Sequence, residues 1–248
     1  MSVAVVGCGP ASLAAAWAAH GLGESVEIFA PKIKSKLRGP VLLQRPVPGI
    51  TVNHPDGWIA QHVQGGTIMD YREKLYGDVN ISINGDILEP GYDAWKMDET
   101  YDKLWDVFES CIVPLKVDSD VLDTLQDEYH LVINTAPRDQ FCHNLDHRFV
   151  SKAVALTWET QLPDQEENSI YFNAVPEVPW VRSSNVFGNV VTEWTPEAAP
   201  EQHHLIHKPI STTCDCWPHV FRTGRFGAWR NETWVDTAYY DTRRALAR

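Results

Sequence analysis

Residues 3–12 read Val-Ala-Val-Val-Gly-Cys-Gly-Pro-Ala-Ser, a short β-branched run that leads into a turn with two glycines. The β-branched run predicts a buried strand. The alanine-rich stretch Leu13–His20 predicts a helix, which ends at Gly21. A second strand is expected over Ser25–Phe29. A strand, a glycine turn, a helix and a second strand in this order are typical of the start of a dinucleotide-binding unit.

The residues of the turn predict how a dinucleotide would be held. Gly7 allows the tight turn, and Gly9 leaves room for a pyrophosphate on the free N–H groups at the start of the helix. Ser12 stands at the third glycine position, where its small side chain suits close packing of helix and strand. The acid that would bind the ribose hydroxyls is missing, because Ala30 ends the second strand and Glu27 lies inside it. A glycine-rich turn without a ligand is the alternative interpretation.

A basic segment follows Ala30 and contains Lys32, Lys34, Lys36 and Arg38. In a dinucleotide-binding unit, loss of the acid together with a gain of cations can indicate the 2′-phosphate of NADP. Runs of charge more often face water. We therefore favour a solvated basic loop and keep NADP as the alternative cofactor.

Composition and charge limit the class of protein. The 248 residues include 21 Lys and Arg against 33 Asp and Glu, a net charge of −12, and 44% are hydrophobic. The negative charge argues against generic binding to nucleic acid or to an anionic membrane. No apolar run approaches the roughly 18 residues that span a bilayer. The five cysteines, an odd number without a disulfide framework, favour a reducing compartment, so a cytoplasmic protein is expected.

The rest of the chain predicts short elements and one clear helix. Turn-forming Pro and Gly are frequent between residues 39 and 96. Apolar residues recur at helical spacing over Met97–Phe108, which predicts a packing helix. The stretch Tyr129–Pro137 predicts a buried strand and a turn that would return the chain to the first sheet. Further strands are expected around residues 154–158, 170–174 and 189–193, and a terminal helix from about Thr233.

Three segments that are far apart in the sequence carry a family resemblance: Val3–Ser12, Leu131–Pro137 and Gly224–Trp229. They resemble the first strand-turn-helix, the returning strand and turn, and the C-terminal flavin segment of the UDP-galactopyranose mutase and flavin amine oxidase superfamily. The whole chain is also similar to small FAD-dependent oxidoreductases encoded by phages of actinobacteria. That similarity is carried by Arg45-Pro46, Tyr76–Asp78, Ala94-Trp95, Tyr101–Trp105 and Cys214–Cys216.

The resemblance implies an α/β flavoprotein with a Rossmann-like, parallel-sheet FAD-binding domain and an inserted, mixed α+β substrate lobe. The FAD-binding domain would comprise residues 1–45, 127–145 and 205–248, and the lobe residues 46–126 and 146–204. The implied cofactor-binding residues are Gly7, Gly9, Pro10, Ala11, Ser12, Thr135, Pro137, Gly224, Arg225, Phe226, Gly227 and Trp234. The backbone N–H of Trp234, at the start of the terminal helix, is a candidate donor to the flavin.

The implied activity is FAD-dependent oxidation or reduction of a small molecule or modified nucleotide, by hydride transfer with flavin N5. One alternative is a non-redox flavoenzyme that resembles the mutase, and another is a non-catalytic dinucleotide-binding module. No catalytic residue is assigned, but Gln44, Arg45, Tyr71 and Arg72 are candidates for contact with the substrate. If the chain is phage-encoded, the expected compartment is the host cytoplasm.

Cys142 and His147, with four residues between them, and Cys214 and Cys216 form a second group of candidates. All four can bind zinc, but their spacing is not that of a standard finger, and Cys-x-Cys is tighter than usual. We favour buried free thiols and expect no metal. Structural zinc and a redox pair of Cys214 and Cys216 are the alternatives.

Overall fold

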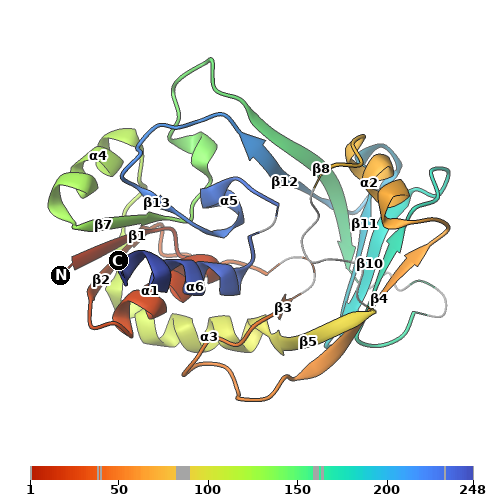
Figure 1. The fold of residues 1–248 in the computed structure, drawn as a ribbon, viewed down its shortest axis with the longest axis horizontal. Helices are drawn as coiled ribbons and strands as arrows, with labels where there is room; N and C mark the ends of the chain where they lie inside the picture. Colours follow the sequence, from red (N-terminus) through yellow and green to blue (C-terminus); the bar gives the residue numbers. More distant parts are fainter. Residues whose placement is uncertain are drawn as a thin grey trace.

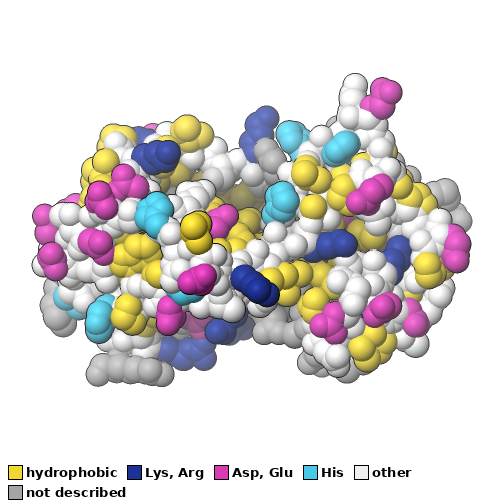
Figure 2. Space-filling view, turned by 90° about the horizontal axis from the view of Figure 1, so that it is seen from above, with side chains coloured by type: hydrophobic (Ala, Val, Ile, Leu, Met, Phe, Trp, Pro, Cys, Tyr) yellow, Lys and Arg dark blue, Asp and Glu magenta, His cyan; other side chains and the backbone are white. Residues whose placement is uncertain are grey.

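The computed structural model describes residues 2–37, 39, 41–81, 90–158, 162, 165–231 and 233–247. These residues form two β-sheets, which lie toward opposite ends of the molecule (Figure 1). Seen from above, a hollow lies between the two parts, and Lys and Arg side chains lie at its margin (Figure 2).

The first sheet consists, among the described residues, of five parallel strands in the order β13-β7-β1-β2-β6. Both faces of the central strand β1 are covered, because Val3 and Val5 lie in one hydrophobic cluster and Ala4 and Val6 in another. Burial on both faces explains why this strand is apolar throughout. The strands are β1 (Ser2–Val6), β2 (Ser25–Ala30), β6 (Ile112–Pro114), β7 (Leu131–Asn134) and β13 (Phe221–Arg222).

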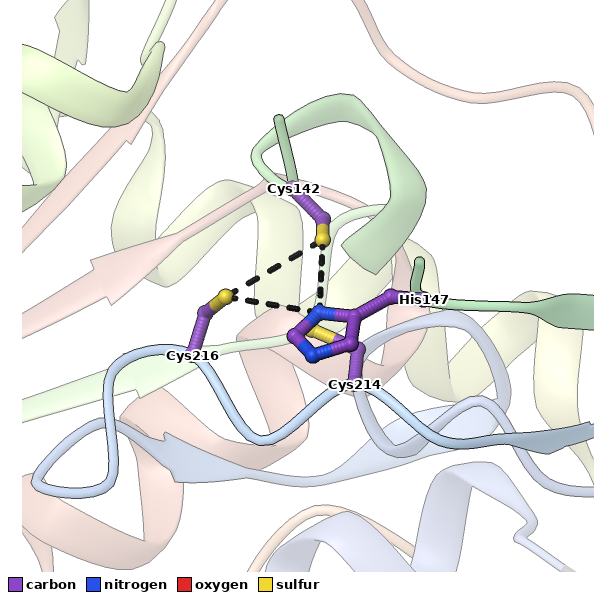
Figure 3. A group of neighbouring side chains, drawn as sticks. All are labelled: Cys142, His147, Cys214 and Cys216. Atoms are coloured by element: carbon purple, nitrogen blue, oxygen red, sulfur yellow. Dashed lines mark hydrogen bonds between the residues drawn. The ribbon is translucent and has the colours of Figure 1, made fainter. Parts of the chain in front are cut away.

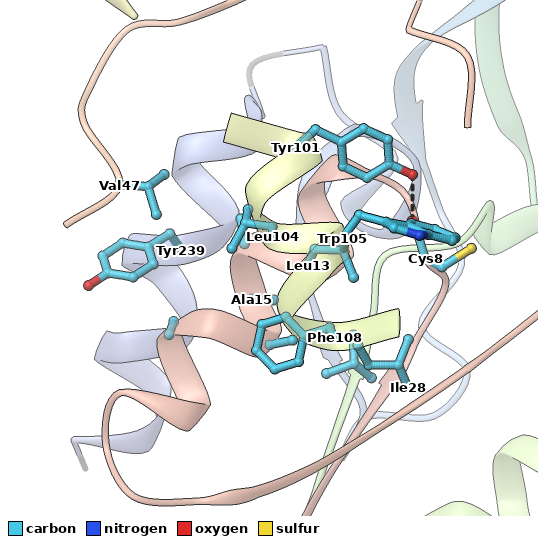
Figure 4. Close-up of a cluster of buried hydrophobic side chains, with 14 of the residues drawn as sticks. Cys8, Leu13, Ala15, Ile28, Val47, Tyr101, Leu104, Trp105, Phe108 and Tyr239 are labelled. Atoms are coloured by element: carbon cyan, nitrogen blue, oxygen red, sulfur yellow. Dashed lines mark hydrogen bonds between the residues drawn. The ribbon is translucent and has the colours of Figure 1, made fainter. Parts of the chain in front are cut away.

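Helices cover both faces of the first sheet. On one face, α1 (Pro10–His20) packs against α3 (Met97–Phe108) and α6 (Val235–Leu246). Side chains of all three helices meet in this core, among them Leu13, Leu104 and Tyr239 (Figure 4). On the other face lies α4 (Ser119–Glu128), which contributes Leu122 and Leu125. The packing helix predicted over Met97–Phe108 is confirmed.

The second sheet is mixed and curled, with eight described strands in the order β12-β8-β11-β10-β9-β4-β5-β3. β4 and β9 pair in parallel, and the other neighbours pair antiparallel. The helix α2 (Ile68–Tyr76) lies against β9 and β10. The strands are β3 (Leu42–Leu43), β4 (Gly57–Gln64), β5 (Gly91–Lys96), β8 (Phe149–Trp158), β9 (Ser169–Asn173), β10 (Trp180–Val186), β11 (Asn189–Trp194) and β12 (His204–Thr212).

The chain divides between the two sheets differently from the expected domain boundaries. β6 pairs with β2, and α3 packs against α1, so these elements lie with the first sheet although the predicted lobe includes residues 46–126. β12 pairs with β8 in the second sheet, although residues 205–248 were predicted to belong to the FAD-binding domain. The pattern of a strand does not say which sheet it joins, because its partners are distant in the sequence.

Short helical turns complete the described chain. They are α5 (Gly224–Ala228) and the 3₁₀ turns η1 (Glu109–Cys111), η2 (Arg138–Gln140) and η3 (Pro196–Ala198). No helix within the described ranges combines the length and apolar composition needed to cross a bilayer.

Candidate functional site

Gly7 forms the turn after β1 and is enclosed by two hydroxyl groups. Its φ of +108° favours glycine, and its N–H donates to the Phe29 carbonyl at 3.0 Å. A Cβ at this position would lie 2.8 Å from both Ser12 Oγ and Thr135 Oγ1. These hydroxyls share a hydrogen bond, and Thr135 lies 3.0 Å from the Val6 carbonyl, to which it can also donate. Ser12, at the third glycine position, therefore links the turn to the residue that follows β7.

Gly9 caps α1 and leaves open space in front of the helix. Pro10 begins the helix, and the N–H groups of Ala11 and Ser12 have no carbonyl partner within it. A Cβ at Gly9 would meet one described atom within 4 Å, the Ser35 Oγ at 3.9 Å. The start of α1 can therefore accept an anionic group, as the predicted pyrophosphate site requires.

The segment Gly224–Gly227 packs directly on this turn. Gly224 has a φ of +69°, and a Cβ there would lie 2.8 Å from the Ala11 Cβ. A Cβ at Gly227 would overlap the carbonyl oxygen of Asn134 at the end of β7. The turn after β1, the end of β7 and α5 therefore meet at one place, although they are distant in the sequence.

Trp234 lies at the start of α6, where it caps the helix. Its backbone N–H, the predicted donor to the flavin, donates to the Thr237 hydroxyl at 3.3 Å. Its indole Nε1 is buried and has no hydrogen-bond partner among the described residues. The indole N–H is therefore a buried donor without a partner among the described residues at this end of α6. Of the other predicted cofactor residues, Pro137 immediately precedes η2, and Phe226 is 41% exposed.

Tyr101 of α3 connects the glycine turn to the loop after β2. Its hydroxyl donates to the Cys8 carbonyl at 2.9 Å (Figure 4). It also accepts from the Ser35 N–H at 3.0 Å. Burial raises the pKa of Tyr101, which keeps the hydroxyl protonated as a donor. The sequence indicated only a packing role for this residue, because its helical spacing says nothing about where the hydroxyl reaches.

Two lysines of the basic loop pair with acids. Lys34 Nζ lies 2.7 Å from Asp102, and Lys32 Nζ lies 3.6 Å from Glu109. These pairs engage two of the cations that a 2′-phosphate would need, and their exposed position favours the solvated loop over the NADP alternative. Arg38 lies outside the described residues.

An inner cavity of about 90 Å³ is enclosed by the second sheet, α2, α5 and the start of α6. Glu193 of β11 is 1% exposed and forms ion pairs with Arg182 of β10 and Lys208 of β12, the latter at 2.5 Å. Arg225 of α5 also faces this cavity, so three cations meet one carboxylate, a surplus of two positive charges (3 − 1 = 2). The lining residues are Gly39, Gln61, Tyr71, Tyr76, Tyr92, Ile170, Phe172, Arg182, Glu193, Ile206, Lys208, Arg225, Asn231 and Trp234.

Burial controls protonation in the inner cavity. It lowers the pKa of Lys208 to about 8, although the attraction of Glu193 acts in the opposite direction. Burial and the charge of Arg182 both lower the pKa of Arg225. Burial disfavours the Glu193 carboxylate, but the attraction of Arg182 and Lys208 outweighs this effect and lowers the carboxyl pKa. A buried site with surplus positive charge favours an anionic ligand.

Two of the four residues predicted to contact substrate lie at the inner cavity or beside it. Tyr71 lines the cavity, and burial raises its pKa well above the ordinary value. Gln44 lies beside the cavity, because its side chain is hydrogen-bonded to Tyr92, which lines it. Burial raises the pKa of Tyr92, and the hydrogen bond from Gln44 opposes this shift. Arg72 instead lies with a guanidinium nitrogen 3.4 Å from the Val79 carbonyl and is not among the lining residues.

Arg45, the fourth predicted substrate residue, ties its segment to α6. It forms an ion pair with Asp236 at 2.7 Å, and its guanidinium lies 4.3 Å from the centre of the Tyr240 ring. Burial raises the pKa of Asp236, and the Arg45 charge opposes this shift. The observed contacts give Arg45 a structural role.

Sequence reasoning missed the charged residues of the inner cavity: Arg182, Glu193 and Lys208. Each is a single charge within a strand, as in Asn189–Trp194, where apolar and β-branched residues predominate. Burying a charge is costly unless it is paired. An isolated charge inside a strand is therefore the pattern that could have indicated them.

A larger cavity of about 780 Å³ adjoins the inner one. Asn231 lines both cavities, and its amide donates to the Tyr76 hydroxyl at 3.0 Å. Arg138, Arg222 and Arg230 contribute positive charge to the larger cavity. Among the described residues that line it, none is a predicted cofactor residue, so this cavity is separate from the glycine turn.

The four Cys and His candidates lie together near this larger cavity. Cys142, His147, Cys214 and Cys216 bring their ligand atoms within 4.8 Å of one another (Figure 3). Cys214 also lines the larger cavity, and the cysteines are free thiols. The sequence placed these residues in one candidate group, and the structure brings them together.

Comparison with solved structures shows the fold. A reduced UDP-galactopyranose mutase matches with a TM-score of 0.53 and 11% identity, over 99% of this chain and 94% of its own. The tetrameric form of 2-methyl-3-hydroxypyridine-5-carboxylic acid oxygenase matches with a TM-score of 0.54 and 14% identity, over 92% of this chain and 76% of its own. A variant of that oxygenase matches with a TM-score of 0.54 and 12% identity, over 98% of this chain and 80% of its own.

The chain therefore has a mixed α/β fold like that of these solved structures, with a parallel sheet and a curled mixed sheet. This confirms the predicted fold class. No protein family and no curated protein matches the sequence.

Proposed function

We propose that this protein is an FAD-dependent oxidoreductase whose FAD lies across the meeting point of the glycine turn, the end of β7 and α5. The observation that carries the proposal is the close packing of Gly224 on Ala11 and of Gly227 on Asn134. This packing unites two glycine segments from distant parts of the chain beside the start of α1. The fold of FAD-binding flavoenzymes supports the same assignment.

The residues at the meeting point fit a dinucleotide. The space in front of Gly9 gives a diphosphate access to the first N–H groups of α1. Trp234 offers its buried indole N–H near the flavin end. Bound FAD supplies the exchange of a hydride with the substrate. The diphosphate would be held by Gly7, Gly9, Pro10, Ala11 and Ser12, with Thr135 and Pro137 beside the nucleotide and Gly224, Arg225, Phe226 and Gly227 along the pyrophosphate and flavin.

The inner cavity is the proposed position of the reacting part of an anionic small molecule or modified nucleotide. Arg182, Lys208 and Arg225 supply positive charge, while Tyr71 and Asn231 supply neutral hydrogen-bonding groups. A volume of about 90 Å³ suits one anionic group and not a whole ligand. Ligand clefts usually measure roughly 300–1,000 Å³. The adjoining cavity of about 780 Å³ provides room for the rest of the molecule.

A flavoenzyme without net redox change, resembling the mutase, is the second candidate. It is favoured by the match of the mutase over 99% of this chain and by the surplus positive charge of the inner cavity, which suits the phosphates of a sugar nucleotide. Turnover without any external electron acceptor would separate it from the oxidoreductase. A non-catalytic module is the third candidate, and it would bind the dinucleotide tightly without being reduced by any donor.

The absorbance spectrum of the purified protein tests the proposal. We expect a flavin spectrum, and we expect mass spectrometry of the released cofactor to identify FAD and not NADP. Anaerobic mixing with anionic candidate substrates should then bleach the flavin absorbance. A protein that is colourless, and remains so after addition of FAD, would contradict the proposal.

We also propose a reducing, cytoplasmic location. The free thiols of the cysteines support it. For a phage-encoded chain, this location is the host cytoplasm.

A further inference from the structure

Three cysteines and one histidine lie together on the connections between the two sheets (Figure 3). Cys142 and His147 lie between β7 and β8, whereas Cys214 and Cys216 lie between β12 and β13. Three sulfur atoms and one imidazole nitrogen thus come together from two segments of the chain.

The three distances among the ligand atoms of Cys142, His147 and Cys216 match the edges of a tetrahedral metal site, and the Cys214 sulfur lies within 4.8 Å of each. The Cys142 Sγ lies 3.2 Å from His147 Nδ1 and 4.0 Å from the Cys216 Sγ, which lies 3.6 Å from the same nitrogen. A tetrahedral Zn²⁺ bound at about 2.3 Å to sulfur and about 2.0 Å to nitrogen requires about 3.8 Å between sulfurs and about 3.5 Å between sulfur and nitrogen. A disulfide would require about 2.05 Å. We propose that Cys142, His147, Cys214 and Cys216 bind one Zn²⁺ ion.

The orientation of His147 is a second, independent observation. Its Nδ1 faces the sulfur atoms, whereas its Nε2 lies 3.4 Å from the Asp215 carboxylate and 3.3 Å from the Asn144 side-chain amide. A metal-bound histidine commonly donates its other N–H to a carboxylate, which fixes the tautomer and the orientation of the ring. Asp215 is therefore a positioning residue for the zinc ligand His147.

Two arginines hold the backbone around Cys214 and Cys216 and supply positive charge. Arg138 donates to the Cys214 carbonyl, and Arg222 donates to the carbonyls of Cys216 and Trp217. Zn²⁺ with three thiolates and a neutral imidazole carries a net charge of −1, and the three thiol protons pass to solvent when the metal binds. The guanidinium groups nearby offset this negative charge.

The metal would crosslink the β7–β8 connection to the β12–β13 connection. β7 pairs with β13 in the first sheet, and β8 pairs with β12 in the second. The ligands lie on both connections, so one ion crosslinks the chain where it leaves and re-enters the first sheet. Four protein ligands leave no open position for a substrate, which makes the site structural.

Metal analysis of the full chain, purified under reducing conditions with Zn²⁺ in the medium, tests the proposal. We expect one zinc per chain by mass spectrometry, with or without bound flavin, so the result is independent of the proposed function. Cys214→Ser and His147→Ala should lose the metal, and Cys111→Ser should retain it because Cys111 lies outside the cluster. Asp215→Asn should retain zinc with an affinity lowered by about 10–100-fold.

Measurements on the unsubstituted protein keep the test decisive if a ligand variant fails to fold. Replacement of Zn²⁺ by Co²⁺ should give the visible spectrum of a tetrahedral thiolate site, and a chelator should lower the melting temperature until Zn²⁺ is restored. Reduced, folded protein without bound zinc would overturn the proposal. So would a disulfide between Cys142 and Cys216 in the native protein, or loss of zinc from Cys111→Ser and the ligand variants alike.

Discussion

Gly224 and Gly77 have the same positive φ and different surroundings. Each has a φ of +69°. A Cβ at Gly224 would lie 2.8 Å from the Ala11 Cβ, whereas a Cβ at Gly77 would meet nothing within 4 Å. Substitution of the two glycines therefore separates the cost of the left-handed conformation from the cost of blocking the contact with α1.

We expect Gly224→Ala to weaken FAD binding by about tenfold or more, because the added methyl group forces α5 away from the start of α1; tenfold is about 1.4 kcal/mol. Gly77→Ala should cost about 1 kcal/mol of stability and leave FAD affinity unchanged. Fluorescence titration with FAD and urea unfolding measure both effects. Equal FAD affinity in the two variants would contradict the proposed cofactor position.

Lys208 makes anion binding in the inner cavity sensitive to pH. Burial lowers its pKa to about 8, so the side chain loses its positive charge as the pH rises from 7 to 9. We expect affinity for sulfate, whose own charge is constant over this range, to fall over the same interval. Calorimetry at the two pH values measures the change, and Lys208→Met should bind weakly at both. The same pH dependence in both proteins would contradict this role.

The same lysine should make the protein more stable as the pH rises, whereas it makes anion binding weaker. Its pKa is 10.5 in the absence of perturbation and about 8 in the folded protein, so between these values the unfolded chain binds more protons. The contribution of Lys208 to the free energy of unfolding therefore rises with pH over this window. Urea unfolding at pH 8 and pH 10, compared with Lys208→Met, isolates this contribution.

Among the helices, α3 links the core of the first sheet to the glycine turn through Tyr101. We expect Tyr101→Phe to cost about 1–3 kcal/mol, because it leaves the buried Cys8 carbonyl without this donor. It should also weaken FAD binding, since it frees the loop that contains Ser35. Tyr129→Phe is the matched control, because it removes an exposed hydrogen bond to Glu27 and should cost about 1 kcal/mol or less. Urea unfolding that finds the two variants equally stable would contradict this role for Tyr101.

The first elements of the chain could be predicted because neighbours in the sequence determine them. The β-branched run, the glycines and the alanine-rich helix are local patterns, and β1, α1 and β2 follow from them. By contrast, β10 was missed, because Ser183, Ser184 and Asn185 are polar and yet buried. Their burial depends on partners across the sheet, such as the hydrogen bond of 2.9 Å between Ser183 and Thr192. No alternation of apolar and polar residues marks such a strand.

The parts of the candidate site that consist of local sequence patterns could be predicted, and the parts that depend on strand pairing could not. The glycine turn and Gly224–Gly227 are recognisable motifs, whereas Arg182, Glu193 and Lys208 come from three strands that strand pairing brings together. The sequence supplied all four members of the Cys and His cluster. It favoured free thiols over zinc, because spacing along the chain does not give the distance between side chains.

At the scale of the whole molecule, the two sheets share the residues that face the proposed FAD. Arg225 and Trp234 line the inner cavity against the second sheet, while their segment packs on the first. We expect FAD at 100 times its Kd to raise the free energy of unfolding by about 2.7 kcal/mol. Hydrogen exchange should slow both in β1–α1 and in β10–β11. Protection confined to one sheet would contradict this arrangement, and Gly224→Ala at the same FAD concentration serves as the control.

The packing of Gly224 on Ala11 also bears on when the proposed FAD could bind during translation. The ribosome makes Gly9 215 residues before Gly224 (224 − 9 = 215). At about 5–20 residues per second, this interval lasts roughly 10–40 s. During this interval the nascent chain has only the first half of the proposed dinucleotide site, so we expect uptake of FAD to begin only after α5 has left the exit tunnel.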